Sequence, residues 1–346
     1  MTAAGPGAVD WVRGLPKAEV HVHLEGSLAP DLVAAAARDA GRDLPPLEFR
    51  DLAGFLAYLD ASCSVITTTE QIESAAYAVA QRSFEAGVRY VDLIWNPTHW
   101  PVWRDRLPAF VDALDAGFRS AAADGLPAVG LCVSLKRTQS ASQAVDLVER
   151  IVALGHPRVV ALSIDGNEAA TGRTGARFAA AFAQARAAGL RCCAHAGESS
   201  GPEGVLDAIE HLGAERIDHG IRAVEDPNLV RRLAALGVPL DVCPTSNVRL
   251  GVARSLAEHP VEVLRRGGVR VSLNTDDPVL FGSTVDGEYR ACASAFGWNG
   301  SDLGDIARTS IESCFAADGL REDLLRDLET YLRSSGTDAT PRPPEP

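Results

Sequence analysis

The chain has 346 residues, of which 46% are hydrophobic and 23% are charged, and its formal net charge is −13 at pH 7. This composition is typical of a globular, soluble protein and excludes extensive disorder. The negative net charge argues against nucleic acid and anionic membranes as partners, because proteins bind both through basic surfaces. It favours a small-molecule partner.

The N-terminal segment carries charged side chains at Asp10, Arg13, Lys17 and Glu19 and has no continuous apolar stretch, so it does not predict a signal peptide. No apolar span is long enough to predict a transmembrane helix. The seven cysteines are odd in number and form no C-x-x-C pair, which favours reduced core residues over a disulfide framework. We therefore expect a cytoplasmic protein with no membrane partner.

Eight short apolar or β-branched segments recur along the chain, and a segment of helical character follows each of them. Strands that alternate with helices predict parallel β/α units, and eight such units predict a closed (β/α)8 TIM barrel. In chain order, the expected strands are Glu19–His23, Tyr90–Trp95, Ala128–Ser134, Val159–Ile164, Arg191–His195, Arg216–His219, Pro239–Cys243 and Val269–Asn274.

Residues 26–89 separate the first two expected strands and far exceed the length of one crossover helix. We expect them to form a helical insertion over the barrel mouth. Their apolar periodicity predicts helices at Leu32–Ala40, Leu52–Tyr58 and Gln71–Ala86. Within this insertion, Phe55, Tyr58 and Leu59 either wall a substrate pocket or pack as an ordinary helix core.

No second domain boundary is evident, so we expect a single domain over residues 1–333. Residues 334–346 are rich in Ser, Thr and Pro and predict a disordered C-terminal tail.

Residues suited to metal binding stand where the expected strands end. His21 and His23 end the first strand, His195 ends the fifth, and Asp276 follows the eighth. Because side chains alternate between the faces of a strand, two histidines at i and i+2 point the same way and can bind one ion. Imidazole and carboxylate ligands suit Zn²⁺ or a similar divalent metal.

Further polar residues accompany this set, since Glu198 follows His195, His219 ends the sixth strand, and Asp277 follows Asp276. The active sites of such barrels lie at the carboxyl ends of the strands, where these residues would meet. The remaining histidines stand in expected loops or helices, and we expect them to be solvated. They are His99, His156, His211 and His259.

From about Leu15 to Phe315, the chain resembles the adenosine deaminase family of the amidohydrolase superfamily. The resemblance rests on four segments with specific motifs. They are Pro16–Ser27 (PKAEVHVHLEGS), His195–Glu198 (HAGE), His219–Gly220 (HG) and Ser272–Pro278 (SLNTDDP).

The resemblance implies one zinc ion per chain, with a water or hydroxide beside it. The implied zinc ligands are His21, His23, His195 and Asp276. Glu198 is then expected to protonate N1 of a 6-aminopurine while hydroxide adds to the adjacent C6. A raised pKa of Glu198 would be needed for this acid role.

Other residues receive roles from the same resemblance. His219 is expected to orient the nucleophilic water or to take its proton. Asp277 is expected to hydrogen-bond the purine N7, and the backbone N–H of Gly166 to meet N3. His23 and Glu25 are expected to lie against the substrate.

Two departures from the family pattern and one match to it bear on the substrate. Glu25 stands where adenosine deaminases usually have Asp, at the position that meets the ribose 5′-hydroxyl. Asp218 resembles the adenine deaminase branch, whereas Gly166-Asn167-Glu168 resembles the adenosine branch. Asp218 and Asp165 are alternatively partners that support the metal ligands.

The leading hypothesis is a hydrolytic deaminase that converts adenosine or 2′-deoxyadenosine to inosine or 2′-deoxyinosine and ammonia. The alternatives within this class are deamination of adenine to hypoxanthine and deamination of a 5′-modified adenosine-like compound. A non-catalytic metal-binding barrel is disfavoured by Glu198, which no ligand set requires, and an amide or ester hydrolase by Asp277. The partner is a small aminopurine, and the sequence leaves the oligomeric state open.

Overall fold

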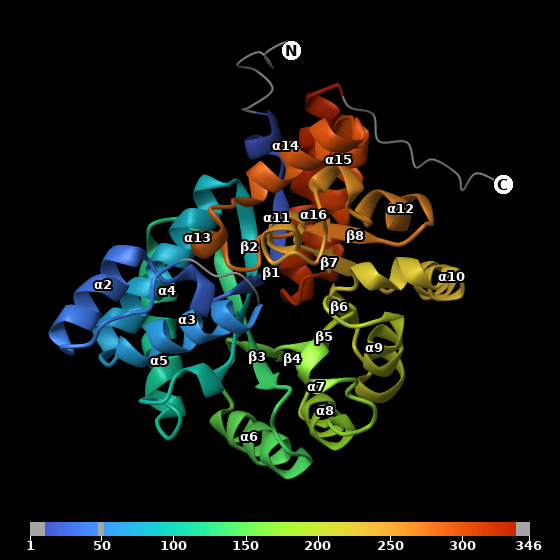
Figure 1. Ribbon diagram of the computed structural model, residues 1–346. Coiled ribbons are helices and arrows are strands. Elements are labelled where there is room, and N and C mark those ends of the chain that lie inside the picture. Colours follow the sequence, from blue (N-terminus) through green and yellow to red (C-terminus); the bar gives the residue numbers. More distant parts are fainter. Residues whose placement is uncertain (1–10, 48–51, 337–346) are drawn as a thin grey trace.

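The computed structural model describes residues 11–47 and 52–336. Eight parallel strands form a barrel in the order in which they occur in the chain, and helices surround it (Figure 1). The predicted (β/α)8 fold is confirmed, and each predicted strand is present. The strands are β1 (Lys17–His23), β2 (Val88–Trp95), β3 (Ala128–Lys136), β4 (Val159–Asp165), β5 (Arg191–Ala196), β6 (Arg216–His219), β7 (Leu240–Val242) and β8 (Val271–Leu273).

The barrel closes between β1 and the segment that follows β8. The backbone N–H of His23 donates to the carbonyl of Asp276 over 2.7 Å, and the N–H of Asp276 donates to the carbonyl of His21 over 3.1 Å. These bonds form a parallel bridge between Val22 and Asp276. The closure is therefore built from segments that carry candidate metal ligands.

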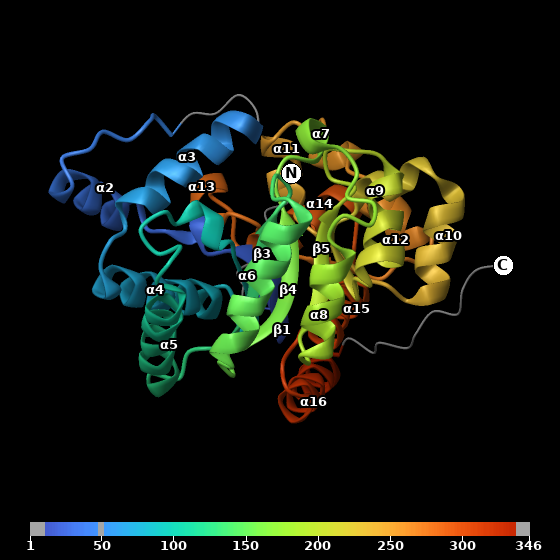
Figure 2. The same cartoon turned by 90° about the horizontal axis from the view of Figure 1, so that it is seen from below.

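The helical insertion after β1 is also present. It contains α2 (Pro30–Asp39), α3 (Leu52–Val65) and α4 (Thr69–Glu85). Helix α4 begins at a capping box, in which Thr68 and Gln71 satisfy each other's free backbone N–H groups. Figure 2 places α3 at the same end of the barrel as α7 (Glu168–Thr171).

The remaining helices belong to the barrel wall or to its mouth. The short helices that follow strands β4, β7 and β8 lie at the mouth and are α7, α11 (Pro244–Arg249) and α13 (Pro278–Phe281). The others are α5 (Leu107–Ala123), α6 (Ala141–Leu154), α8 (Ala179–Ala187), α9 (Pro202–Asp207), α10 (Pro227–Leu236), α12 (Val261–Arg266), α14 (Val285–Phe296), α15 (Gly300–Ser313) and α16 (Asp318–Ser334).

A charged cluster lies inside the barrel. The guanidinium of Arg216 at the start of β6 contacts Asp92 at 2.6 Å and Asp241 at 2.8 Å, and it stacks over Phe315. All three charged residues are fully buried. Because each charge has an oppositely charged neighbour, the cluster avoids the cost of an unpaired buried charge.

Three other predictions concern the cysteines, membrane-spanning helices and the C-terminal tail. The seven cysteines are buried and unpaired, as expected. None of the described helices is both long and apolar enough to cross a lipid bilayer. Of the predicted disordered tail, Ser334 belongs to α16, and residues 337–346 lie outside the described residues.

Candidate active site

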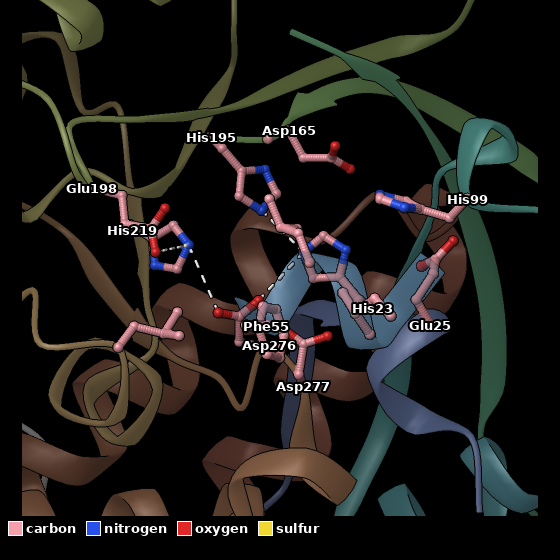
Figure 3. Close-up of a pocket in the computed structure, with 14 residues that line it drawn as sticks. His23, Glu25, Phe55, His99, Asp165, His195, Glu198, His219, Asp276 and Asp277 are labelled. Carbon is pink, nitrogen blue, oxygen red and sulfur yellow. Dashed lines mark hydrogen bonds and ion pairs between the residues drawn. The ribbon is translucent and has the colours of Figure 1, made fainter. Parts of the chain in front are cut away.

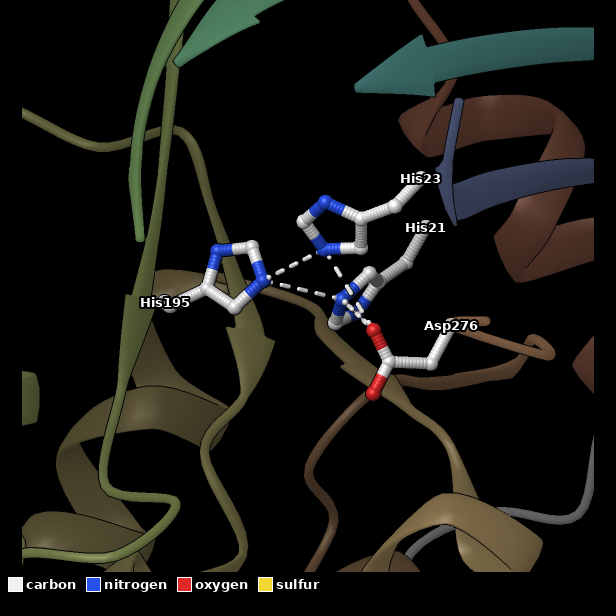
Figure 4. A group of neighbouring side chains, drawn as sticks. All are labelled: His21, His23, His195 and Asp276. Carbon is white, nitrogen blue, oxygen red and sulfur yellow. Dashed lines mark hydrogen bonds and ion pairs between the residues drawn. The ribbon is translucent and has the colours of Figure 1, made fainter. Parts of the chain in front are cut away.

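Four side chains converge at the barrel mouth: His21 and His23 of β1, His195 of β5, and Asp276 after β8 (Figure 4). The Nε2 atom of His195 lies 3.1 Å from Nε2 of His21 and 3.0 Å from Nε2 of His23. The Oδ1 atom of Asp276 lies 3.4 Å and 3.3 Å from the same two nitrogens. All four side chains are buried.

This donor set fits a tetrahedral zinc ion. Ligand atoms at about 2.1 Å from a tetrahedral zinc are about 3.4 Å apart, close to the spacing found here. Three imidazole nitrogens facing one another are also hard to satisfy by hydrogen bonds alone, because a neutral ring has only one N–H. A cation between the nitrogens and the Asp276 carboxylate satisfies all four donor atoms.

A second donor group shares His21 with the first and adds His219 and Cys243. Burial raises the pKa of the Cys243 thiol well above its usual value. Since the thiolate is the metal ligand, this group is the weaker candidate, and the histidine and aspartate set is preferred.

The candidate ligands are held by further contacts. Oδ2 of Asp218 lies 3.2 Å from Nδ1 of His195, and the backbone carbonyl of Asp241 lies 3.0 Å from Nδ1 of His21. Such partners fix the tautomer of a ligand histidine, so that its other nitrogen can bind the metal. Ser246 donates to Oδ2 of Asp276 over 2.6 Å.

Glu198 and His219 lie beside this set (Figure 3), and Oε1 of Glu198 is 3.7 Å from Nε2 of His219. Burial, together with the nearby charge of Asp276, raises the pKa of Glu198 to about 7. Burial and the neighbouring His21 hold the pKa of His219 well below its usual value. The pair thus combines a carboxyl group that can carry a proton near neutral pH with a neutral imidazole.

The loop that carries Glu198 is fixed by a residue to which the sequence analysis gave no role. The buried carboxylate of Glu168 accepts hydrogen bonds from four consecutive backbone N–H groups of residues 197–200, at 2.9–3.3 Å. The guanidinium of Arg137 lies 3.2 Å from the same carboxylate and balances its charge. Glu168 is therefore a positioning residue for Glu198.

Asp277 is held against the turn that follows β1. A Cβ atom built on Gly26 would lie 1.8 Å from Oδ1 of Asp277, so only glycine allows this close approach. Burial and the adjacent carboxylates raise the pKa of Asp277 well above its usual value. A protonated Asp277 can donate a hydrogen bond.

Glu25 is held by the segment after β2. One oxygen of Glu25 accepts from the indole N–H of Trp100 over 2.7 Å and from the backbone N–H of Asn96 over 2.9 Å. The other oxygen, Oε2, is buried and has no hydrogen-bond partner among the described residues. The side chain of Asn96 also donates to Asp165 over 2.6 Å, and Asp165 lines the same pocket as the candidate ligand His23.

These groups line one pocket at the barrel mouth. Phe55 and Leu59 of α3 form part of its wall and pack against Phe281 of α13. Gly166 also lines the pocket, with a φ of 105° that favours glycine. All the predicted site residues except His21 line this pocket, and His21 lies among the ligand candidates behind it.

The expectation of solvated histidines was wrong for His99 and His259. His99 is buried, lines the pocket and contacts Asp60 of α3. His259 is buried and contacts Asn247, whose amide lies 3.3 Å from Nδ1 of His219. In both cases the partner comes from a different element, so the local sequence carried no signal for the contact.

Comparison with known proteins agrees with this geometry. A model of the family described as adenosine deaminase matches residues 16–331. The chain belongs to the adenosine deaminase family. Among the curated members, it is 36% identical to an adenine deaminase of Sinorhizobium fredii over 91% of this chain and 98% of that protein. It is 34% identical to an aminodeoxyfutalosine deaminase of Streptomyces avermitilis over 93% of this chain and 92% of that protein.

Solved structures of the family lead to the same conclusion. An adenine deaminase from Arthrobacter aurescens superimposes with a TM-score of 0.86 at 31% identity and covers 92% of this chain and 99% of its own. A zinc-bound amidohydrolase from Burkholderia ambifaria gives a TM-score of 0.87 at 27% identity and covers 97% of this chain and 96% of its own. The chain is thus a hydrolytic deaminase of the aminopurine type, which acts on a C–N bond.

Proposed function

We propose that the protein is a zinc-dependent adenine deaminase, which hydrolyses adenine to hypoxanthine and ammonia. The observation that carries the proposal is that relatives matching over nearly their whole length, at 34–36% identity, are named adenine deaminase. Adenosine, the leading substrate in the sequence analysis, is less well supported than this alternative. Glu25 also supports the alternative, because its unpartnered oxygen can accept from an N–H of the free base.

A zinc ion held by His21, His23, His195 and Asp276 would supply a hydroxide nucleophile near neutral pH. Glu198 then protonates N1 of the purine as the nucleophile adds to C6, so the ring nitrogen does not carry negative charge. Such proton transfer typically contributes about 10²–10⁴-fold to a rate. His219 holds the attacking oxygen in place and accepts its proton.

Asp277 and Gly166 fix the purine plane. The protonated carboxyl of Asp277 donates to N7, and the backbone N–H of Gly166 donates to N3. When the C6–N bond breaks, the amino group leaves as ammonia and C6 becomes a carbonyl carbon. Water supplies the oxygen and two protons. The proton that His219 accepts passes to the leaving amino group, and the second restores the acid form of Glu198. N1 keeps the proton that Glu198 gave it, which yields the 6-oxo tautomer.

A second candidate substrate has a specific observation behind it. The relative from Streptomyces avermitilis is named aminodeoxyfutalosine deaminase and matches with the same 34% identity as an adenine deaminase of Streptomyces coelicolor. Deamination of aminodeoxyfutalosine is therefore the runner-up.

The test is ammonia release from adenine, adenosine, 2′-deoxyadenosine and aminodeoxyfutalosine, compared as kcat/KM with the zinc-loaded enzyme and with a chelator control. We expect adenine to give the highest value and chelator to abolish turnover. A higher kcat/KM for any nucleoside would contradict the proposal.

Glu198→Gln provides the matched variant, because it keeps the size of the side chain and removes its acid function. We expect turnover of adenine to fall at least about 100-fold while zinc content is unchanged. Retained turnover would remove Glu198 from the acid role.

A further inference from the structure

An ionic contact joins the helical insertion to the barrel at the far end of the pocket. Nδ1 of His99, in the turn after β2, lies 2.5 Å from Oδ1 of Asp60 on α3. Nζ of Lys136, at the end of β3, lies 3.8 Å from Oδ2 of the same Asp60. The His99 side chain is 5% exposed and the Asp60 side chain 49% exposed, so the contact runs from the pocket wall to the surface.

Two hollows border the residues of this contact. His99 lines the inner pocket together with Glu25 and Asp165. A second, outer hollow is lined by Thr98, which precedes His99, and by Lys136, which contacts Asp60. His99 therefore lines the inner pocket, while its chain neighbour Thr98 and the Asp60 partner Lys136 line the outer hollow.

The purine enters the inner pocket with a defined direction. Glu198 and His219 lie on one side of the ligand candidates, and His99 and Glu25 lie on the opposite side (Figure 3). In a purine, N9 lies at the edge of the fused rings away from C6 and N1. With C6 beside the ligand candidates and N1 beside Glu198, the N9 edge therefore faces Glu25 and His99.

A free base and a nucleoside differ at this edge. The free base presents an N9–H, which matches the unpartnered, buried Oε2 of Glu25. A nucleoside presents a sugar carbon, and its sugar must pass the position that the His99 ring occupies. Passage requires the ring to leave Asp60, which sacrifices a charge-assisted hydrogen bond.

We propose that Asp60 and His99 form a specificity-determining pair that closes the far end of the purine pocket and restricts the substrate to free aminopurine bases. The inference rests on the proposed function, because that function sets the direction of the purine. His99 forms the closing wall, and Asp60 acts through His99 by holding its ring in place. Neither side chain takes part in the chemical step.

Several neighbours of His99 favour the protonated form of its ring. Burial alone would lower its pKa, but the hydrogen bond to Asp60 and the charges of Asp165 and Glu25 outweigh this effect and raise it. Replacing Asp60 removes the strongest of these partners and leaves the ring free to change rotamer. The inner pocket and the outer hollow then become continuous.

The experiment compares kcat/KM for adenine, 9-methyladenine and adenosine in the zinc-loaded wild type, Asp60→Ala and His99→Ala. Asp39→Ala is the matched control, because it removes an exposed carboxylate from the insertion helix α2 without touching the pocket. We expect the wild type to favour adenine over both N9-substituted compounds by at least about 100-fold, as sites built to bind an N–H commonly do. Asp60→Ala and His99→Ala should each raise the adenosine-to-adenine ratio at least tenfold, and Asp39→Ala should leave it within twofold.

The possible failures are distinguishable. A wild type that prefers adenosine to adenine overturns both the proposed function and the role of the Asp60–His99 pair. A wild type that prefers adenine, with unchanged ratios in both variants, overturns only the role of the pair. An equal loss of activity on all three compounds shows that the pair serves only folding, and it also overturns the proposed role of the pair in specificity. His99→Ala keeps the test valid if Asp60→Ala does not fold.

Discussion

His219 and Asp276 follow different strands, yet both have a left-handed backbone with a φ of 65°, and Nε2 of His219 lies 3.8 Å from Oδ2 of Asp276. Among the described residues, they are the non-glycine positions with positive φ. This conformation costs about 1–2 kcal/mol for a residue with a Cβ. Its coincidence at two neighbouring site residues indicates that the fold sacrifices local stability to direct both side chains into the barrel mouth.

Replacement of His219 should separate its chemical role from its backbone strain. Asn tolerates the left-handed region, so we expect His219→Asn to keep the wild-type Tm and zinc content and to lose at least about 100-fold in kcat. His219→Val should lose the same activity and a further stability of about 1–2 kcal/mol, because a β-branched residue fits this region poorly. Thermal unfolding and turnover measure the two effects, and an active His219→Asn enzyme would contradict the assignment.

Glu168→Gln should slow the reaction without removing the metal. The amide that replaces the carboxylate has one acceptor oxygen for the four backbone N–H groups of residues 197–200, and its NH₂ group opposes the others. We expect kcat to fall about 10–100-fold through misplacement of Glu198, with a smaller change in KM and unchanged zinc content. Glu203→Gln, at an exposed position of α9, is the control. An equal rise in KM and fall in kcat would argue for a general loss of structure.

Asp218→Asn should weaken metal binding. The carboxylate beside Nδ1 of His195 raises the basicity of the ring and fixes its tautomer, and loss of such a partner commonly costs about 10–100-fold in metal affinity. Competition with a chromogenic chelator measures the zinc Kd. Asp305→Asn, at an exposed position of α15, is the control. Equal zinc affinity in the two variants would show that Asp218 does not support His195.

His259 should make stability depend on pH. Its Nε2–H donates to Asn247, and its Nδ1 accepts from the N–H of Val261 over 3.2 Å. Burial lowers its pKa from 6.5 to about 4, so the folded chain holds the neutral ring while the unfolded chain protonates it below about pH 6.5. The stabilisation is complete above pH 6.5 and is lost as pH falls towards 4, by about 3 kcal/mol in all.

The measurement is the free energy of unfolding at intervals between pH 7 and pH 4, for the wild type and for His259→Gln. Gln does not titrate, so the variant should lose stability less steeply over this range. Parallel curves for the two proteins would place the titration elsewhere.

Most of the barrel could be predicted because short apolar or β-branched segments alternate along the chain with segments of helical character. The ends of β7 and β8 could not, since the predicted Pro239–Cys243 and Val269–Asn274 include residues beyond the paired ladder. Helix α3 was predicted to end at Tyr58 but continues to Val65. The buried residues Leu59 and Cys63 extend its apolar contact with the barrel.

The candidate site could be predicted to the extent that the order of the strands determines where their carboxyl ends lie. Carboxyl ends of parallel strands meet at one end of a barrel, so His21, His195 and Asp276 were expected together. The supporting contacts obey no such rule. The partner of His99 is an insertion residue, and Glu168 binds a loop about 30 positions away through backbone groups that every sequence has.

Because all seven cysteines are buried, their reaction with a thiol reagent can report local unfolding of the chain. A thiol reagent reacts only with a sulfur that solvent reaches, so the closed molecule should consume none, and each modified cysteine records that its surroundings have separated. Cys63 lies in the insertion and Cys193 in β5. The order in which these two become labelled therefore reveals whether the insertion lifts away before the barrel itself comes apart.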